Sequence, residues 1–254
     1  MNILEELQRM IDGNAFYIRS GSNEIKISEG KGMRTLSFNG VVYSRINLNG
    51  QYTNEYWDTF LPLCSLSDVT DVLMIGLGGG TIAYQMKRLR GDRVNIDVVE
   101  IDRNMIDAMK HFLPKGIDVN MVIGEGAEYV GSTKNKYDVI ILDAYVNSLI
   151  PEQFFSDKFI DDAYGALKAK GVLAVNYINS SNTEEKLDDF VRRSRKKFIA
   201  YELNALHLTL NRIALFAKNI RKKEMVYSAS KAGMDDTEHG RDILAGYEKM
   251  REIY

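Results

Sequence analysis

The chain has 254 residues, of which 45% are hydrophobic and 27% charged, as expected for a soluble globular protein of one large domain or one and a half. A net charge of −2 argues against a general nucleic-acid binder, and a single cysteine, Cys64, excludes a disulfide framework and fits a reducing cytoplasm. Three scattered histidines suggest no zinc site, and there is no apolar run of about 18 residues that could span a membrane.

A small antiparallel sheet is expected near the N-terminus, over about residues 14–48. Residues 3–11 form a short amphipathic patch, and two hairpins with a side-chain period of two follow it. In the first hairpin, 16–19 and 24–28 flank a polar turn. In the second, 34–38 and 41–46 flank Asn39-Gly40, a dipeptide favoured in tight hairpin turns.

A helix is expected over residues 53–64, with Thr53 or Asn54 as its N-cap. Its apolar side chains fall on one face, and this favours burial in the core over contact with a ligand. These side chains are Trp57, Phe60, Leu61 and Cys64.

From residue 70 onward, strands alternate with helices, which predicts a parallel sheet. The expected strands are 72–75, 95–99, 119–123, 137–142 and 172–177, and the expected helices are 81–89, 102–111, 157–167 and 184–197. Two more strands, 198–203 and 212–217, have a short link between them, so we expect an antiparallel pair at the sheet edge. The fold class is therefore α/β, with seven strands of which five are parallel.

The tail from Arg221 is polar and then becomes a predicted helix near residues 242–253. The chain is expected to divide into three segments: an N-terminal β-hairpin domain at 1–52, a nucleoside-binding catalytic domain at 53–220 and a C-terminal helical tail at 221–254.

A glycine-rich turn follows the first parallel strand, at Gly76, Gly78, Gly79 and Gly80. Glycines allow the backbone to approach a ligand closely, and the amides of the next helix then face that ligand with partial positive charge. The dinucleotide fingerprint is broken because Thr81 stands at its third glycine, and no phosphate-loop lysine follows. The alternative is a turn needed only for packing of the helix on the strand.

Four acids stand at the carboxyl ends of the parallel strands, where ligands of open α/β sheets bind. They are Glu100, Asp102, Glu125 and Asp143. Carboxylates there suit a ligand that carries a ribose and a positive charge, such as a sulfonium nucleoside, whereas they repel a phosphate-rich dinucleotide. The alternative for each acid is a solvated cap at the start of a helix.

Several stretches resemble successive motifs of the spermidine/spermine synthase family. They are Val72-Leu-Met-Ile-Gly-Leu-Gly-Gly-Gly-Thr, Val98-Val-Glu-Ile-Asp, Ile123-Gly-Glu-Gly-Ala-Glu-Tyr, Tyr137-Asp-Val-Ile-Ile-Leu-Asp-Ala-Tyr and Phe154-Phe-Ser-Asp-Lys-Phe. The segment from Leu36 to Val42 resembles the hairpin of that family's N-terminal β-domain. The resemblance spans about residues 33–218 and implies the seven-stranded fold of S-adenosylmethionine-dependent methyltransferases, a small β-domain in front of it, and a homodimer.

The same resemblance implies a role for individual residues. Glu100 would hold the ribose hydroxyls, with Ile101 beside it. Glu125 and Gly126 would contact the adenine, the turn at Gly76, Gly78 and Gly79 would bind the nucleoside, and Asp143 would be the catalytic acid–base residue. The implied co-substrate is decarboxylated S-adenosylmethionine, the implied acceptor is a polyamine amine, and no metal is expected.

The chemistry of these residues agrees with the resemblance. An alkylammonium has no lone pair with which to attack carbon, so a carboxylate that accepts its proton and orients the amine assists the reaction. Tyr145, Tyr52, Tyr56 and Gln51 are candidates for the acceptor pocket, and for the tyrosines packing in the core is the alternative.

The chain also departs from the family pattern. The acid of the glycine loop falls on Gly79, the second acid after Asp143 is replaced by Val146, and Tyr43 stands where a glutamine usually follows the hairpin. The Tyr-His pair that precedes the first parallel strand has no clean match near residues 51–56. These departures concern the acceptor and the amine of the aminopropyl donor rather than the nucleoside.

Three functions therefore stay open from the sequence. The first is an aminopropyltransferase resembling spermidine synthase, the second is a methyltransferase that uses intact S-adenosylmethionine, and the third is a catalytically silent relative. We expect a cytoplasmic protein without a signal peptide, because the first residues lack a basic region followed by an apolar one.

Overall fold

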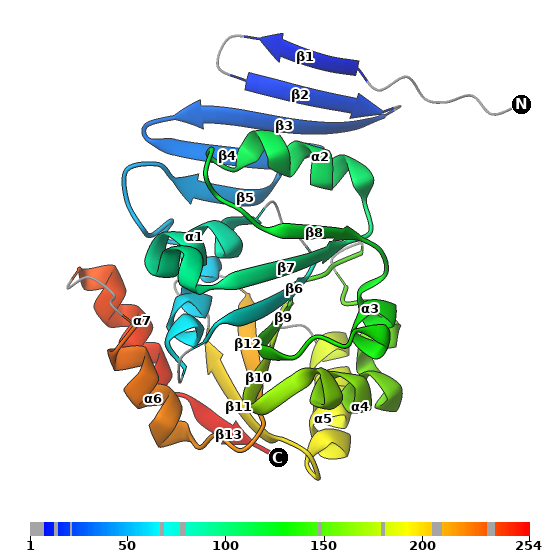
Figure 1. Cartoon of the computed structure of the whole chain (residues 1–254), viewed down its shortest axis with the longest axis vertical. Coiled ribbons are helices and arrows are strands. Elements are labelled where there is room, and N and C mark those ends of the chain that lie inside the picture. The colour runs from blue at the N-terminus through cyan, green and yellow to red at the C-terminus, as the bar shows by residue number, and fades with distance from the viewer. Residues whose placement is uncertain are drawn as a thin grey trace, which may run out of the picture.

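The computed structural model describes residues 8–12, 15–20, 22–66, 69–76, 80–146, 149–178, 181–204, 210–232 and 237–254. Two β-sheets organise the chain, a small one that carries the N-terminus and a larger one with helices on both faces (Figure 1). The boundaries of the three expected segments, at residues 52 and 220, stay a prediction.

The N-terminal sheet is antiparallel throughout, in the order β1-β2-β3-β4-β5. Its strands are β1 (Gln8–Asp12), β2 (Ala15–Ser20), β3 (Asn23–Gly30), β4 (Met33–Phe38) and β5 (Val41–Asn47). Both central residues of the Asn39-Gly40 turn have positive φ, 49° and 80°, as a type I′ hairpin requires. The two predicted hairpins are present, and β1 extends them into the second half of the amphipathic patch. Residues 3–7 of that patch lie outside the described residues.

The small sheet is fixed to the large one through two helices, α1 (Thr81–Arg90) and α2 (Arg103–Phe112). The ring of Phe16 stacks on that of His111 with centroids 4.1 Å apart, and Arg34 Nη1 donates to the carbonyl of Phe112 at 2.6 Å. On β5, the hydroxyl of Ser44 is hydrogen-bonded to that of Thr81. The N-terminal sheet is thus held against the helices that follow the first two parallel strands.

The helix expected at 53–64 is a 3₁₀ helix, η1 (Tyr56–Ser65), and the predicted cap is wrong. The residue at the N-cap position is Glu55, and its side chain makes no capping hydrogen bond. Thr53 and Asn54 lie before the helix, where their backbone amides donate to the carboxylate of Asp58. Pro62 inside the helix has no N–H to offer to an α-helical ladder. The apolar residues expected in the core are buried, among them Phe60 and Cys64.

The large sheet has the order β13-β11-β12-β10-β9-β6-β7-β8. Its strands are β6 (Asp71–Ile75), β7 (Asn95–Glu100), β8 (Asn120–Ile123), β9 (Tyr137–Leu142), β10 (Leu167–Ile178), β11 (Ile199–Asn204), β12 (Asn211–Ala217) and β13 (Arg251–Ile253). The neighbours from β10 to β8 are parallel, and this confirms the five predicted parallel strands.

Two predictions about the last strands are wrong. The antiparallel pair β11 and β12 does not end the sheet, because β12 lies between β10 and β11 and β13 pairs with the other side of β11. The C-terminal helix expected to reach residue 253 is α7 (Glu238–Glu248), and the residues after it turn back to form β13, an eighth strand.

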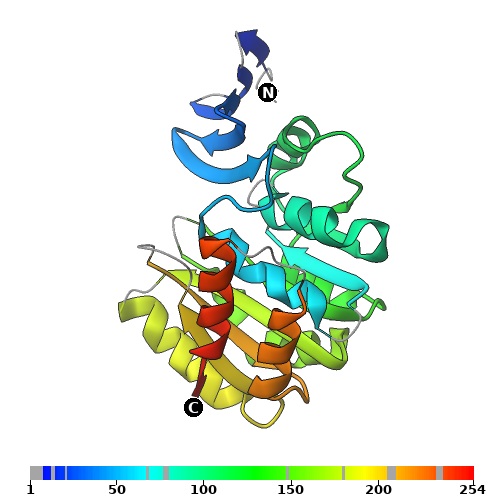
Figure 2. The same ribbon diagram turned by 90° about the vertical axis from the view of Figure 1, so that its left-hand side faces the viewer.

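Helices cover both faces of the large sheet (Figures 1 and 2). One face packs against α3 (Gly126–Ser132), α4 (Asp157–Ala166) and α5 (Ser181–Ser194), and the other against α1, α2, η1, α6 (Lys222–Ser230) and α7. On β6, Val72 and Met74 face one cluster while Leu73 and Ile75 face the other, so the strand is apolar throughout. Helix α3 was not predicted, since the first helix expected after the strand at 119–123 was the one at 157–167.

Among the described residues, no helix combines the length and the apolar character needed to cross a membrane.

Candidate active site

The carboxyl ends of four neighbouring strands, β9, β6, β7 and β8, lie side by side at one end of the large sheet. The amide of Gly76 donates to the carbonyl of Val99 at 2.9 Å, and the amide of Asp143 donates to that of Ile75, also at 2.9 Å. On the next strand, the amide of Gly124 donates to the carbonyl of Glu100 at 3.0 Å. Gly76 and the acids expected at the strand ends are therefore brought to the same end of the sheet, as the parallel topology requires.

Asp143 follows β9 directly, and its side chain is buried. Its Oδ1 accepts a hydrogen bond from Asn176 Nδ2 at 2.7 Å, and its Oδ2 accepts one from the hydroxyl of Tyr56 at 3.2 Å. Burial raises the pKa of Asp143 above its ordinary value, although the hydrogen bonds from Asn176 and Tyr56 oppose this rise. The carboxyl group is thus buried, held by hydrogen bonds from two sides, and more easily protonated than an ordinary aspartate.

Two tyrosines accompany this carboxyl group. Burial and then the negative charge of Asp143 raise the pKa of Tyr56, and the same two causes raise that of Tyr145. Both hydroxyls therefore stay protonated near neutral pH and act as hydrogen-bond donors. The hydroxyl of Tyr145 donates to the carbonyl of Asn176 at 2.8 Å, so it is already engaged by the protein.

The glycine at the end of β6 has a packing role of its own. Gly76 has φ +83°, and a Cβ atom there would lie 2.4 Å from the carbonyl oxygen of Asp143. Only a residue without a side chain lets the end of β9 come this close. The packing alternative therefore accounts for Gly76, whereas Gly78 and Gly79 lie outside the described residues and their role stays a prediction.

Glu100 and Asp102 stand after β7 and have different surroundings. Asp102 caps α2, because its Oδ1 accepts from the amide of Asn104 at 2.8 Å, and this is the solvated-cap alternative. Glu100 Oε1 accepts from the amide of Asp102 at 2.8 Å, which bends the Glu100 carboxylate back over the turn. Between them, Ile101 leaves 70% of its surface exposed and offers an apolar face beside the turn.

Glu125 and Gly126 begin α3. Glu125 Oε2 accepts from the amide of Glu128 at 2.9 Å, and its Oε1 accepts from Gln153 Nε2 at 3.2 Å. A Cβ atom on Gly126 would lie 2.2 Å from Cγ2 of Ile75, so the start of α3 presses directly on β6. Glu125 is therefore a helix cap in this structure. It lies next to the end of β8, where the resemblance places the adenine.

The remaining acceptor-side candidates are placed less directly. Tyr52 is 8% exposed and its ring meets that of His239 edge-on, with centroids 5.1 Å apart. The Nε2 of Gln51 is buried and has no hydrogen-bond partner among the described residues. Of the segment 51–56, it is Tyr56 whose hydroxyl reaches Asp143.

The sequence interpretation missed Asn176. This residue lies on β10 and is 1% exposed, and its Oδ1 accepts from Asn211 Nδ2 at 3.0 Å, which fixes the orientation of its amide toward Asp143. The available signal was a lone polar residue near the carboxyl end of the apolar run 172–177. A buried amide at such a position needs a partner, and the partner is the acid on the neighbouring strand.

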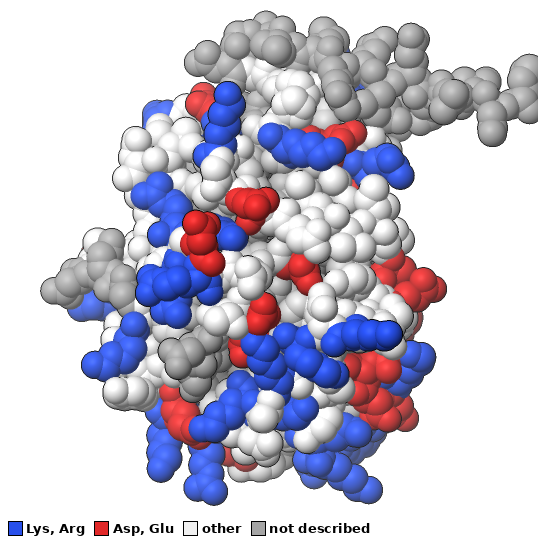
Figure 3. Space-filling view, in the orientation of Figure 1, with Lys and Arg blue, Asp and Glu red and all other residues white. Residues whose placement is uncertain are grey.

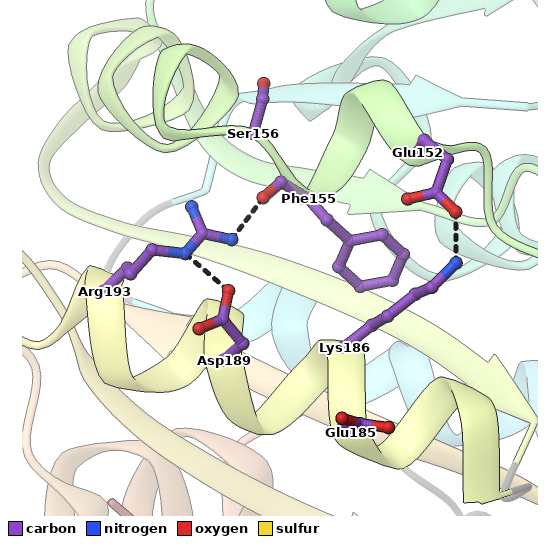
Figure 4. A pocket seen from close by; sticks show the side chains of 7 residues that line it. All are labelled: Glu152, Phe155, Ser156, Glu185, Lys186, Asp189 and Arg193. Atoms are coloured by element: carbon purple, nitrogen blue, oxygen red, sulfur yellow. Dashed lines mark hydrogen bonds and ion pairs between the residues drawn. The ribbon is translucent and has the colours of Figure 1, made fainter.

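A separate groove of about 450 Å³ lies between α5 and the segment around η4 (Glu152–Phe155), shown in Figure 4. Four of its five charged side chains form two pairs, Lys186 with Glu152, and Arg193 with Asp189 at 2.8 Å. None of the predicted site residues lines this groove. Because its charges are largely satisfied by each other, it offers little to hold a charged ligand.

Charge of both signs is spread over the surface. On the face shown in Figure 3, basic side chains gather over the lower half, with acidic side chains interspersed among them. Within the described part of the chain, no three or more His, Cys, Asp or Glu side chains come together in a way that could hold a metal ion.

The central part of the chain matches a known family model. Residues 59–222 match the spermine/spermidine synthase domain. The chain is 34% identical over 125 residues, 49% of its length, to a probable polyamine aminopropyl transferase of Bifidobacterium longum, and the match covers 28% of that protein. It is 31% identical over 131 residues, also 49% of its length, to a polyamine aminopropyltransferase of Clostridium perfringens, of which the match covers 46%. The chain thus spans less than half the length of these relatives.

The fold has a counterpart among solved structures. A spermidine synthase of Thermotoga maritima aligns with a TM-score of 0.68 at 21% identity, covering 96% of this chain and 85% of the other. The alignment extends beyond the stretch matched by the family model, so the whole architecture is shared, including the N-terminal sheet.

Proposed function

Because the chain belongs to the spermine/spermidine synthase family, we propose that it is a polyamine aminopropyltransferase. The proposed reaction transfers an aminopropyl group from decarboxylated S-adenosylmethionine to an amine of a polyamine. The observation that carries this proposal is the buried carboxyl group of Asp143, held by Asn176 at 2.7 Å and by Tyr56 at 3.2 Å at the end of a central strand.

The nucleoside would bind along the ends of β6, β7 and β8. Glu100 would accept hydrogen bonds from the ribose hydroxyls, which a carboxylate at this place in an α/β sheet does well. The exposed side chain of Ile101 would cover one face of the adenine, and Glu125 and Gly126 would lie at its edge. Gly78 and Gly79 would let the backbone approach the sulfonium group of the nucleoside. Gly76 would allow the turn to pack closely against the end of β9.

The acceptor amine would meet Asp143. An ammonium group transfers its proton to the carboxylate, and the lone pair so freed attacks the methylene carbon beside the sulfonium. The carbon–sulfur bond breaks, its electron pair goes to sulfur, and a neutral thioether leaves as methylthioadenosine. A base whose pKa is raised toward the working pH accepts such a proton more readily than an ordinary aspartate, and burial acts on Asp143 in this direction.

The hydroxyl of Tyr56 and the amide of Asn176 would keep the carboxylate oriented while it exchanges its proton. Tyr145, Tyr52 and Gln51 would line the acceptor side, with the unpartnered Nε2 of Gln51 available to a ligand. No metal is needed in this scheme. We further propose a cytoplasmic homodimer, divided into segments at residues 52 and 220.

The methyltransferase alternative has the same fold but weaker support. The loss of an acid at Gly79 would suit the carboxylate of intact S-adenosylmethionine, yet the relatives matched in sequence are named polyamine aminopropyltransferases. Aminopropyl transfer is therefore the function that the family favours.

Calorimetry with both sulfonium nucleosides, followed by an assay for methylthioadenosine with 1,4-diaminobutane and its longer relatives, tests the proposal. We expect tighter binding of the decarboxylated compound and release of methylthioadenosine only when an amine is present. Tighter binding of the intact compound, with methyl transfer, would support the methyltransferase instead. Failure of both to bind would indicate a silent relative.

A further inference from the structure

A second buried carboxylate lies behind the acceptor side of the site. Asp58, on η1, is completely buried and collects several hydrogen bonds from the segment just before the helix. Its Oδ2 accepts from the amides of Thr53 and Asn54 at 2.9 and 2.8 Å, and its Oδ1 accepts from the hydroxyl of Thr53 at 2.9 Å. Gln85 Nε2, from α1, also donates to Asp58 and to the carbonyl of Gln51.

One more partner of Asp58 comes from the far end of the chain. His239, in the first turn of α7, places Nε2 at 2.8 Å from Asp58 Oδ2, although 181 positions separate the two residues. The imidazole is 11% exposed and meets the ring of Tyr52 edge-on. Figure 2 shows the C-terminal helix lying against the segment that carries Asp58.

This cluster fixes the backbone of residues 51–56. Asn54 adopts a left-handed conformation, with φ 62°, and its own amide donates to the carboxylate of Asp58. Tyr56 follows two residues later, and its hydroxyl reaches Asp143 at 3.2 Å. The position of Tyr56 beside Asp143 therefore depends on a turn that is held by the carboxylate of Asp58. His239 contacts the same carboxylate.

The attachment of α7 does not depend on His239 alone. Helix α7 is also attached by Tyr247, whose hydroxyl donates to the carbonyl of Thr59 at 3.0 Å, and by the buried side chain of Ile243. Buried pairs of ionisable groups often contribute no more to stability than apolar residues of the same size, so they are weak evidence for a purely structural role. They do fix geometry, because each oxygen accepts only from defined directions.

We propose that His239 is a positioning residue for the acceptor side of the site. Through Asp58 it holds the turn at Thr53 and Asn54, and through that turn it sets the place of Tyr56 on Asp143. Helix α7, beyond the stretch matched by the family model, would then be part of the machinery that receives the amine. The proposal rests on the proposed function of Asp143.

The test compares His239→Leu with His239→Gln. Leucine fills the space but donates nothing, whereas the amide of glutamine can place a donor near the position of Nε2. We expect His239→Leu to raise KM for the diamine about tenfold, with the Kd for methylthioadenosine within about twofold of wild type. His239→Gln should restore most of the acceptor KM. Tyr247→Phe, which removes the hydrogen bond from α7 to the carbonyl of Thr59 on η1, is the matched control and should leave KM unchanged.

An unchanged acceptor KM in His239→Leu, or an equal rise in Tyr247→Phe, would show that the histidine only supports the fold. If His239→Leu does not fold, Thr237→Ala takes its place, since Thr237 caps the turn that carries His239 by accepting from the amide of Gly240 at 3.1 Å. A raised KM in that variant supports the proposal and an unchanged one overturns it. An inactive wild type would contradict the proposed function alone, and diamine binding by calorimetry would then replace KM as the readout.

Discussion

At the scale of single residues, the carboxyl group of Asp143 combines burial with two hydrogen-bond donors of different kinds. The amide of Asn176 cannot lose a proton, and the raised pKa of Tyr56 keeps its hydroxyl protonated, so both favour the ionised form of Asp143 without supplying a charge. In the proposed reaction, the positive charge that would stabilise this carboxylate fully is that of the amine substrate. An aspartate in such surroundings is set up to take a proton from a cation that arrives and then leaves.

Asp143→Asn tests this directly. The amide of asparagine has nearly the same shape, can accept from Asn176 and can donate to Tyr56, but it cannot accept a proton. We expect the rate of aminopropyl transfer to fall by at least about a hundredfold, the usual contribution of a general base. Nucleoside affinity should stay within about tenfold, or about 1.4 kcal/mol.

The measurement is a single-turnover assay combined with calorimetric titration of methylthioadenosine. Asp161→Asn, which alters an exposed carboxylate on α4, is the control and should match wild type in both. Turnover that survives in Asp143→Asn would remove this residue from the mechanism.

The residue scale also shows what sequence patterns could and could not find. Asp143 was predicted because an acid directly after an apolar strand of a parallel sheet falls at the ligand-binding edge. Asn176 belongs to the same cluster but sits inside an apolar run, where one polar residue gives no hint of its partner. The contact between Asp58 and His239 was beyond any pattern, since nothing local links positions 181 apart.

At the scale of elements, the strands were predicted well where a buried run had clear ends. Tyr137–Leu142 has the predicted bounds, because both faces of a central parallel strand are apolar and its limits are polar. The C-terminal helix was predicted too long for a related reason. Met250 and Ile253 continue the helical spacing of Ile243 and Tyr247, yet Met250 is buried from the link after the helix and Ile253 is partly buried from a strand. Periodicity cannot distinguish these outcomes over so few residues.

The eighth strand is held by a polar contact as well as by its backbone. Arg251 on β13 donates through Nε to Glu202 Oε2 at 2.7 Å, and the hydroxyl of Tyr177 donates to the other oxygen of the same carboxylate. Burial alone would raise the pKa of Glu202, but the bonds from Tyr177 and Arg251 outweigh it and lower the pKa. Glu202 is therefore an ionised group on β11, the second strand from the sheet edge, and Arg251 of β13 is one of the cations that balance its charge.

Arg251→Met should loosen this strand. It keeps an apolar side chain of similar length but leaves Glu202 without its cationic partner, and because Arg251 itself is largely exposed we expect a loss of about 1 kcal/mol in the free energy of unfolding. Urea denaturation measures the change. Lys249→Met, at an exposed position just before the strand, should stay within about 0.5 kcal/mol of wild type. Equal effects of the two changes would contradict a specific role for the contact with Glu202.

At the scale of the whole molecule, the buried acid makes stability depend on pH. The pKa of Asp143 is raised in the folded state, so between the ordinary pKa of an aspartate and this raised value the folded chain holds more protons than the unfolded one. Its contribution to stability is therefore greatest at low pH and is lost as pH rises through that window. Above the window, the folded protein carries a buried charge that the unfolded chain holds at no cost.

Asp143→Asn should remove this loss. We expect the variant to melt at a higher temperature than wild type at neutral pH, with a difference that shrinks as the pH falls toward the range where Asp143 is protonated in both states. Differential scanning calorimetry over a pH series measures it. A difference between the two proteins that does not change with pH would contradict this account.

The nucleoside side and the acceptor side of the candidate site are formed by different parts of the chain. The turn at Gly76 and the end of β9 touch so closely that a Cβ atom would not fit between them, so the nucleoside half and the base form one unit inside the stretch matched by the family model. The support of Tyr56 comes mainly from residues before that stretch and from α7 after it, with Gln85 of α1 as a contribution from inside the stretch. Exchanging these flanking segments between relatives would then be a route to new amine preferences, with the chemistry of the sulfonium nucleoside inherited unchanged.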